Sequence, residues 1–307
     1  MEKRLTKYDY IISVLIVFML IAAAGAFFYG WKSGYSEAQT KYEEMIAKEQ
    51  EEKTQGSIAY HQQHLVSFYY TVYQPYRNFQ DKWFEQLQNM DRNSTTVDNG
   101  SVMKELHKTA AAKYEEASQA QIPEASPLLR QAQSSYLKSL KLFMDATASW
   151  QSKSNSYKGA ELINELEKDV YFQEAKNFAL TGQQQYFASI VEWNKTVNAG
   201  LQGLTMVTKP DLTVKEWNQL NLNLKNQFTA GLLVSAKQFG PYIPMDAVTR
   251  IDDFFQSGKA KKLGIDSISK ALDTLLSTGA IRNGDFLENR SKYSQEDALP
   301  QLPFFTK

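Results

Sequence analysis

The stretch that decides the fold is residues 127–150, PLLRQAQSSYLKSLKLFMDATASW. Apolar and small side chains recur in it at intervals of three and four residues, which places them on one face of an α-helix. That stripe consists of Leu129, Ala132, Tyr136, Leu140, Phe143, Thr147 and Trp150. Ser126 and Pro127 suit the N-cap and the first position of a helix. We therefore predict a long helix that buries one face against partner helices.

The residues before this stretch predict two further helices. The first begins near Ile58 and has the same spacing, with Pro75 inside it, so we expect a kink or a two-part helix there. Its stripe consists of Leu65, Phe68, Tyr69, Val72, Tyr73, Tyr76, Phe79, Trp83, Leu87 and Met90. Residues 91–100 are rich in turn formers, and an alanine-rich helix follows to about Gln121.

The residues after the stretch continue the helical pattern. A helix from about Gly159 would carry a stripe of Leu162, Leu166, Val170, Phe178, Phe187, Ile190, Trp193 and Val197. Thr213 and Glu216 form a capping-box pattern, which predicts a helix that runs to about Phe239. Two shorter helices are expected over 245–256 and 266–278. Alternating β-branched runs are missing from the sequence, so we predict an all-α protein.

The N-terminal region contains Tyr10 to Tyr29, YIISVLIVFMLIAAAGAFFY, which has no charged residue. About twenty apolar residues suffice for a helix to cross a membrane, so we predict a single transmembrane helix in contact with lipid. Lys3, Arg4 and Lys7 precede it, and the excess of basic residues on that side predicts a cytoplasmic N-terminus. The bulk of the chain would then be extracytoplasmic.

A cleaved signal peptide is the alternative to this anchor. A basic start and an apolar run are followed by small residues at 22–26, as in a secretory signal. The apolar run continues through Phe27 and Phe28, however, which makes it long enough to span a membrane. We favour the uncleaved, single-pass anchor, with secretion as the alternative.

Residues 36–54 are charged and contain neither glycine nor proline. Glu37–Lys41, Glu44–Lys48 and Glu49–Lys53 are favourable i,i+4 pairs, which predict a solvated helical stalk. A short coiled coil is the alternative. The predicted divisions are 1–9 (cytoplasmic tail), 10–30 (transmembrane helix), 31–56 (stalk), 57–205 (long-helix bundle) and 206–307 (C-terminal helical subdomain with an extended tail).

The composition narrows the function classes. The sequence has 34 basic and 34 acidic residues, so it offers no basic footprint for nucleic acid. It has no cysteine, which removes disulfides, thiolate metal sites and cysteine nucleophiles. His61 and His64 have a chelating spacing but no Glu-x-x-His motif beside them, so we expect no metal and no other cofactor.

Catalytic motifs are also missing from the sequence, which has no nucleophile elbow and no phosphate-binding loop. The carboxylates of Asp252 and Asp253, and those of Glu165 and Glu167, are predicted to lie on solvated faces. An enzyme is therefore not expected. Only a glycosidase-like carboxylate pair about 5–10 Å apart would make the protein an envelope hydrolase.

Aromatic residues supply the candidate partner surface, because tyrosine is enriched in protein interfaces. The candidates are Tyr69, Tyr70, Tyr73, Tyr76, Phe304 and Phe305. For the tyrosine cluster as a whole we favour an aromatic core over a partner surface, with Tyr70, which is off the stripe, the better surface candidate. For the tail around Phe304 and Phe305 we favour docking on the bundle over partner binding.

These features predict a non-enzymatic, membrane-anchored interaction or scaffold protein of the cell envelope. Its helical domain would bind an envelope protein or a second copy of itself. The alternative is a ligand-binding or sensor module with a pocket between helices, which would act through a partner membrane protein.

Overall fold

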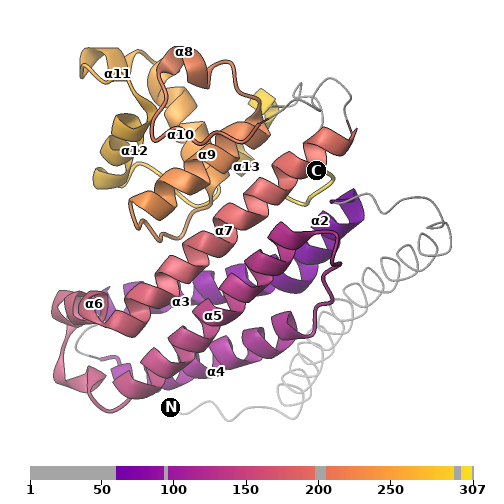
Figure 1. Cartoon of the computed structure of the whole chain (residues 1–307). Coiled ribbons are helices and arrows are strands. Elements are labelled where there is room, and N and C mark those ends of the chain that lie inside the picture. The colour runs from indigo at the N-terminus through magenta and orange to yellow at the C-terminus, as the bar shows by residue number, and fades with distance from the viewer. Residues whose placement is uncertain (1–59, 93–95, 198–204, 294–298, 306–307) are drawn as a thin grey trace, which may run out of the picture. The chain divides into compact units, whose positions relative to one another are not determined.

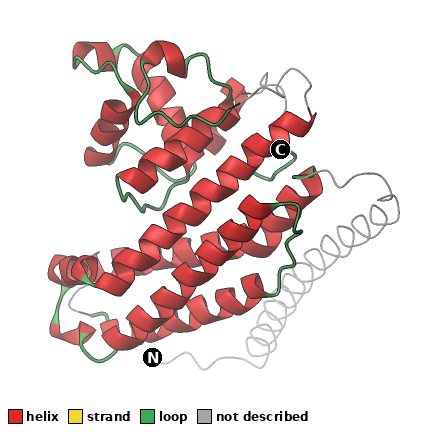
Figure 2. Ribbon diagram, viewed as in Figure 1, coloured by secondary structure: helices red, strands yellow, loops and turns green. Residues whose placement is uncertain are grey.

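The computed structural model describes residues 60–92, 96–197, 205–293 and 299–305. Helices dominate these ranges, which contain no strand, as Figure 2 shows. An isolated bridge between Thr213 and Ser267 is the extended pairing found within them. The predicted all-α class is therefore confirmed for the described part of the chain.

The long helices come first along the chain and the shorter ones follow (Figure 1). The first half contains α2 (Gln62–Phe68), the π-helical turn η1 (Tyr69–Tyr73), α3 (Gln74–Arg92), α4 (Asn99–Ser118), α5 (Pro127–Trp150), the 3₁₀ turn η2 (Ser154–Ser156), α6 (Gly159–Lys168) and α7 (Val170–Val197). The second half contains α8 (Val214–Trp217), α9 (Leu222–Ser235), α10 (Pro244–Gln256), α11 (Lys259–Lys262), α12 (Ile268–Ser277), α13 (Asp285–Asn289) and the 3₁₀ turn η4 (Arg290–Tyr293).

Helix α5 lies between α4 and α7 in a bundle that α3 completes. Its stripe from Leu129 to Trp150 is buried at every position, so the predicted long helix with one covered face is confirmed. Helix α3 reaches α5 through large rings. The ring centroids of Phe79 and Phe143, for example, are 4.9 Å apart. Packing of these faces, rather than helix propensity alone, stabilises helices of this length.

Pro75 interrupts the first helix in the predicted place. Proline lacks an N–H group and its ring clashes with the carbonyl of the residue four positions earlier. Here the π-helical turn Tyr69–Tyr73 comes immediately before α3, in which Pro75 is the second residue. The wider turn accommodates the proline, and the chain continues helically into α3. The predicted two-part helix is confirmed.

The single helix predicted from Gly159 to Val197 is wrong, because it breaks at Asp169 into α6 and α7. The Asp169 carboxylate accepts hydrogen bonds from the backbone N–H groups of Tyr171 (2.9 Å) and Phe172 (3.3 Å), so it caps a new helix. The break shifts the phase of the stripe. Both predicted stripe members at the ends of α7, Val170 and Val197, are exposed rather than buried.

The helix predicted from Thr213 to Phe239 is also two helices. The capping box of Thr213 and Glu216 is present, which confirms that part of the prediction. Helix α8, however, ends at Trp217, and α9 starts again with Asn221 as its N-cap, accepting from the N–H of Leu224 at 2.9 Å. The predicted short helices over 245–256 and 266–278 correspond to α10 and α12 and are confirmed.

Ile58–Lys307 forms one compact unit. Within it α9 packs on α7, where buried Asn223 donates a hydrogen bond to Asn194 at 2.7 Å. Helix α10 contacts α9, α12 and α13, and the buried Asp246 of α10 accepts from the N–H of Phe286 in α13 at 2.9 Å. The predicted boundary between residues 205 and 206 stays a prediction.

The C-terminal tail docks on the helices. Leu302 and Phe304 are buried, and the Phe304 ring centroid lies 5.5 Å from that of Tyr69 and 6.3 Å from that of Phe187. Leu302 and Phe304 therefore belong to the core. Exposed rings at this position would be an aggregation liability, and docking removes it.

The predicted tail, transmembrane helix and stalk over 1–56 lie outside the described residues. Among the described helices, none combines the length and the apolar character needed to cross a membrane.

The docked tail leads to a stability prediction. Phe304→Ala should lower the free energy of unfolding by about 3 kcal/mol, because it removes a buried ring that contacts η1 and α7. Tyr171→Ala, which truncates an exposed ring, should change it by less than about 0.5 kcal/mol. Urea unfolding of the full-length protein in detergent, followed by tryptophan fluorescence, measures both. Equal losses for the two variants would contradict the docking.

Candidate functional site

The six predicted site residues do not form one exposed surface. Tyr73, Tyr76 and Phe304 are buried, while the other three residues are half-buried. Phe304 is brought against Tyr69 and Tyr73, whereas Phe305 turns to Phe286 of α13 with ring centroids 6.0 Å apart. The partner-surface role stays a prediction. Of the six residues, Tyr69, Tyr70 and Phe305 keep part of their side chains exposed to solvent, where a partner could contact them.

Four buried tyrosines meet where α3, α5 and α7 come together. The rings of Tyr76 and Tyr136 lie 4.5 Å apart and those of Tyr73 and Tyr186 lie 4.8 Å apart, measured between centroids. Burial raises the pKa of all four hydroxyls above the usual tyrosine range. This arrangement keeps the phenols neutral and makes them poor bases or nucleophiles at neutral pH.

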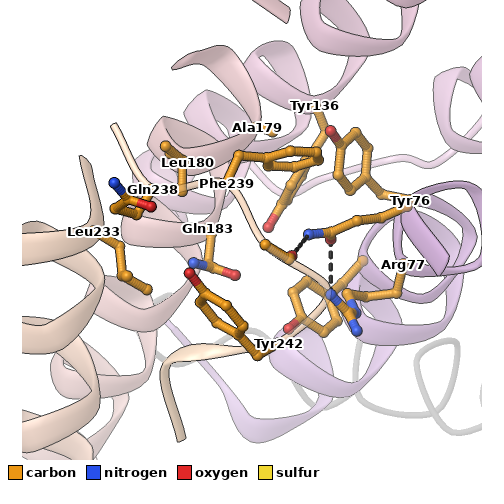
Figure 3. Close-up of a pocket in the computed structure, with 13 residues that line it drawn as sticks. Tyr76, Arg77, Tyr136, Ala179, Leu180, Gln183, Leu233, Gln238, Phe239 and Tyr242 are labelled. Carbon is orange, nitrogen blue, oxygen red and sulfur yellow. Dashed lines mark hydrogen bonds between the residues drawn. The ribbon is translucent and has the colours of Figure 1, made fainter. Parts of the chain in front are cut away.

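A small cavity adjoins these tyrosines, and Figure 3 shows the side chains that converge on it. Gln80 Nε2 donates to the Gly240 carbonyl at 2.6 Å, and Arg77 Nη1 donates to Gln80 Oε1 at 2.8 Å. The Tyr73 and Tyr136 hydroxyls line it without a hydrogen-bond partner. Its volume of ≈10 Å³ is about enough for one water molecule, far below the volume of a ligand pocket.

Asp252 is buried, so the prediction that it lies on a solvated face is wrong. Its Oδ1 accepts from Trp217 Nε1 at 2.6 Å and lies 3.1 Å from Lys225 Nζ, while Oδ2 accepts from the Tyr293 hydroxyl at 2.8 Å. Burial and this carboxylate together raise the pKa of Tyr293. This network joins α8, α9 and α10 to η4. Each of its polar side chains has a hydrogen-bond or ion-pair partner, so the network leaves no free acid or base.

Of the two histidines, His64 is also used by the fold. His64 is buried, and its Nδ1 lies 3.1 Å from Ser126 Oγ, at the start of α5. Glu165 and Glu167 lie toward the surface, each 2.6 Å from a lysine ammonium. Within the described ranges, no group of three or more His, Asp or Glu side chains converges to hold a metal ion.

A larger groove lies at the outer edge of α3, where α6 and the loops before α10 and α13 approach it. Its volume is ≈790 Å³, within the range of binding sites in proteins. We call it the α3–α6 groove, and it is lined by Asp81, Phe84, Glu85, Leu87, Gln88, Asp91, Ala160, Ile163, Asn164, Pro241 and Asn283.

The α3–α6 groove has an apolar floor and an acidic rim. The half-buried side chains of Phe84, Leu87 and Ile163 form the floor, and the carboxylates of Asp81, Glu85 and Asp91 stand exposed on the rim. Among the described residues that line the groove there is no lysine, arginine or histidine. Such a surface suits a ligand that combines an apolar side chain with positive charge.

Two nearby cations partly balance the rim. Arg77 pairs with Asp81 at 3.0 Å, and Lys82 lies 3.4 Å from Glu85, whereas Asp91 takes part in no ion pair among the described residues. The Arg77 side chain is largely buried, whereas the Lys82–Glu85 pair is more exposed and contributes little energy. The carboxylates of Glu85 and Asp91 therefore remain available to an incoming cation.

Sequence reasoning missed the groove. Leu87 belongs to the predicted core stripe, and its half-exposed position cannot be read from the spacing. The one available signal was Phe84, an aromatic residue next to the buried Trp83 and therefore on the flank of the stripe. Its partners on α6 and in the two loops are distant in sequence.

Comparisons of the chain with protein-family models, with curated proteins and with solved structures find no match. Function is therefore inferred from the side chains of the groove and the cavity.

The buried tyrosines predict how stability depends on pH. Their pKa values are higher in the folded protein than in the unfolded chain, where tyrosine titrates near 10. Stability should therefore be constant below about pH 9 and fall above about pH 10, by up to about 1.4 kcal/mol per pH unit for each tyrosine. Urea unfolding at increasing pH measures the loss. Tyrosinate absorbance should show these tyrosines ionising only as the protein unfolds, and full ionisation of the folded protein near pH 10 would contradict this.

A matched pair of substitutions tests the cavity lining. Tyr76→Phe should cost about 1 kcal/mol, because the Tyr76 hydroxyl shares a 2.8 Å hydrogen bond with Ser139. Tyr136→Phe should stay within about 0.5 kcal/mol of the parent or stabilise it, since its hydroxyl has no partner. Thermal unfolding of both variants is the measurement. A larger loss for Tyr136→Phe would show that this hydroxyl has a partner in solution.

Proposed function

We propose that this chain is a membrane-anchored interaction or scaffold protein of the cell envelope, without enzymatic activity. The α3–α6 groove carries the proposal, because an apolar floor open to solvent is the kind of surface that binds a polypeptide. The closed core supports it further. The buried His64 and Asp252 are used by the fold, and the tyrosine cavity has no room for a substrate.

The proposed location follows from the N-terminal sequence. Tyr10 to Tyr29 would anchor the chain in the membrane with residues 1–9 in the cytoplasm, and the charged segment over 31–56 would hold the helical unit away from the lipid. If the apolar segment is instead cleaved as a signal, the same unit would act as a secreted interaction protein. The mass of the mature protein distinguishes these two forms.

A ligand-binding or sensor module is the second candidate. Its support is the polar lining of the tyrosine cavity, where Arg77, Gln80 and two unpartnered hydroxyls converge. A pocket for a small molecule needs some 300–1,000 Å³, so the segment with Gly240 and Tyr242 would have to move to admit one. This requirement makes the interaction protein the better-supported function.

In-cell crosslinking of the full-length protein, followed by mass spectrometry, tests the proposal. We expect a reproducible partner that is lost when residues 58–307 are deleted and the anchor is kept. Ile163→Asp places a charge in the groove floor and should reduce recovery of the partner at least about tenfold. Val170→Asp makes the same change on an exposed valine nearby in the chain and should leave recovery unchanged.

Thermal unfolding of both aspartate variants must first show that they fold. Recovery of the chain without any crosslinked protein, from cells that express it stably, would overturn the interaction function. Equal recovery with Ile163→Asp and Val170→Asp would keep the function but move it away from the groove.

A further inference from the structure

The second half of the chain carries a basic corner with an exposed leucine. Lys259, Lys261 and Lys262 of α11 are exposed, and Leu263 after them is 63% exposed. None of these lysines takes part in an ion pair with a described residue. We call these four residues the α11 corner.

The backbone makes the α11 corner project. Gly258 (φ 71°) and Gly264 (φ 67°) flank it, both in the left-handed conformation that glycine adopts without strain. A Cβ atom added at either glycine would meet no other atom within 4 Å, so both ends of the corner stand in open space. A sharp, projecting segment of this kind is well shaped to enter a groove.

The α11 corner and the α3–α6 groove are complementary. The corner offers three lysines around one exposed leucine, and the groove offers three carboxylates around an apolar floor. Each surface has the charge that the other lacks and an apolar part that the other can cover, and opposite charges around an apolar contact favour specific association. Both surfaces belong to the same chain.

We propose that the α11 corner of one copy docks in the α3–α6 groove of a second copy. Figure 1 shows α11 well apart from α6, so a molecule does not fill its own groove with its own corner. The contact is therefore head-to-tail, since it joins two different surfaces. Contacts of this type build rings or filaments.

Other occupants fit the groove less well. Residues 36–54 of the same chain carry six Glu against three Lys, so their net negative charge opposes the acidic rim. The α11 corner alone would also suit an anionic lipid surface, but that partner would leave the groove unused. Only a second copy uses both surfaces at once.

The contact is small, and small interfaces give weak association in solution. The inference therefore rests on the proposed membrane anchoring, which would confine copies to one plane and raise their effective concentration. Its electrostatic part should also weaken as salt is raised, because exposed charges are screened.

A charge-exchange experiment with the full-length protein tests the contact. Lys261→Glu/Lys262→Glu makes the corner acidic, and Glu85→Lys/Asp91→Lys makes the groove basic. Each variant alone should self-associate at least about tenfold more weakly than the parent, because like charges then face each other. An equimolar mixture should recover self-association, because each variant's corner now suits the other's groove.

The control Lys108→Glu/Lys215→Glu makes the same charge change at exposed lysines elsewhere and should behave as the parent. Energy transfer between fluorescently labelled copies in phosphatidylcholine vesicles, at low and high salt, gives the affinities. Parent-like self-association of both groove and corner variants, or no recovery in the mixture, would overturn the proposal. Binding of the parent, but not of the corner variant, to phosphatidylcholine vesicles with about one third phosphatidylglycerol, without recovery in the mixture, would assign the corner to lipid instead.

Disulfide trapping is an independent test of the contact. The chain has no cysteine, so introduced cysteines are the only ones that can form a disulfide between copies. Co-expressed Gln88→Cys and Leu263→Cys copies should form a mixed dimer in the membrane under oxidation, whereas Ser134→Cys with Leu263→Cys should not. No more mixed dimer with Gln88→Cys than with Ser134→Cys, in cells where a partner of another kind is still recovered by crosslinking, would sink this inference and leave the interaction function standing.

Discussion

The structure depends on how α3, α5 and α7 are held together at Ser139. This buried serine on α5 donates its hydroxyl proton to the Ala175 carbonyl on α7 at 2.7 Å, so it accepts the hydrogen bond of the Tyr76 hydroxyl from α3 at 2.8 Å. The small side chain lets the helices approach and satisfies all three polar groups. The rings of Tyr76 and Tyr136 pack beside it in a tilted arrangement and fix the inner face of α3. With that face fixed, Phe84 and Leu87 on the flank of α3 are presented at the edge, where the groove forms.

The spacing of apolar residues predicted the long helices because a single face of each is buried. Every stripe residue of α5 follows from that pattern, whereas the interruption before Pro75 follows from the missing N–H group of proline. The errors have a common physical cause. Asp169 and Asn221 are short polar residues inside periodic stretches, and each uses its side chain to cap a new helix. Periodicity alone gives no warning of such a break, since the apolar residues on both sides keep almost the same spacing.

The candidate site was less predictable than the fold. Asp252 reads as a surface residue because its neighbour Asp253 is also charged, yet Trp217, Lys225 and Tyr293 reach it from three separate segments. The α3–α6 groove likewise joins parts of the chain that are up to some two hundred residues apart in sequence. Half-buried floor residues have the same composition as core residues, so the sequence cannot separate them. Tertiary contact, rather than local pattern, creates both features.

The balance of 34 basic and 34 acidic residues gains a different meaning in the structure. Neutrality argues against a partner with a single strong charge, but it says nothing about how charge is distributed. Screening limits each surface charge to a range of about 10 Å at moderate salt, so a lysine-rich corner and an acidic groove act independently on one neutral molecule. A chain that binds its own copies through opposite charges must carry both signs on separate surfaces. Overall neutrality with local segregation of charge is compatible with such self-complementarity, and it also avoids the general repulsion between copies that a strongly basic or acidic chain would experience at low salt.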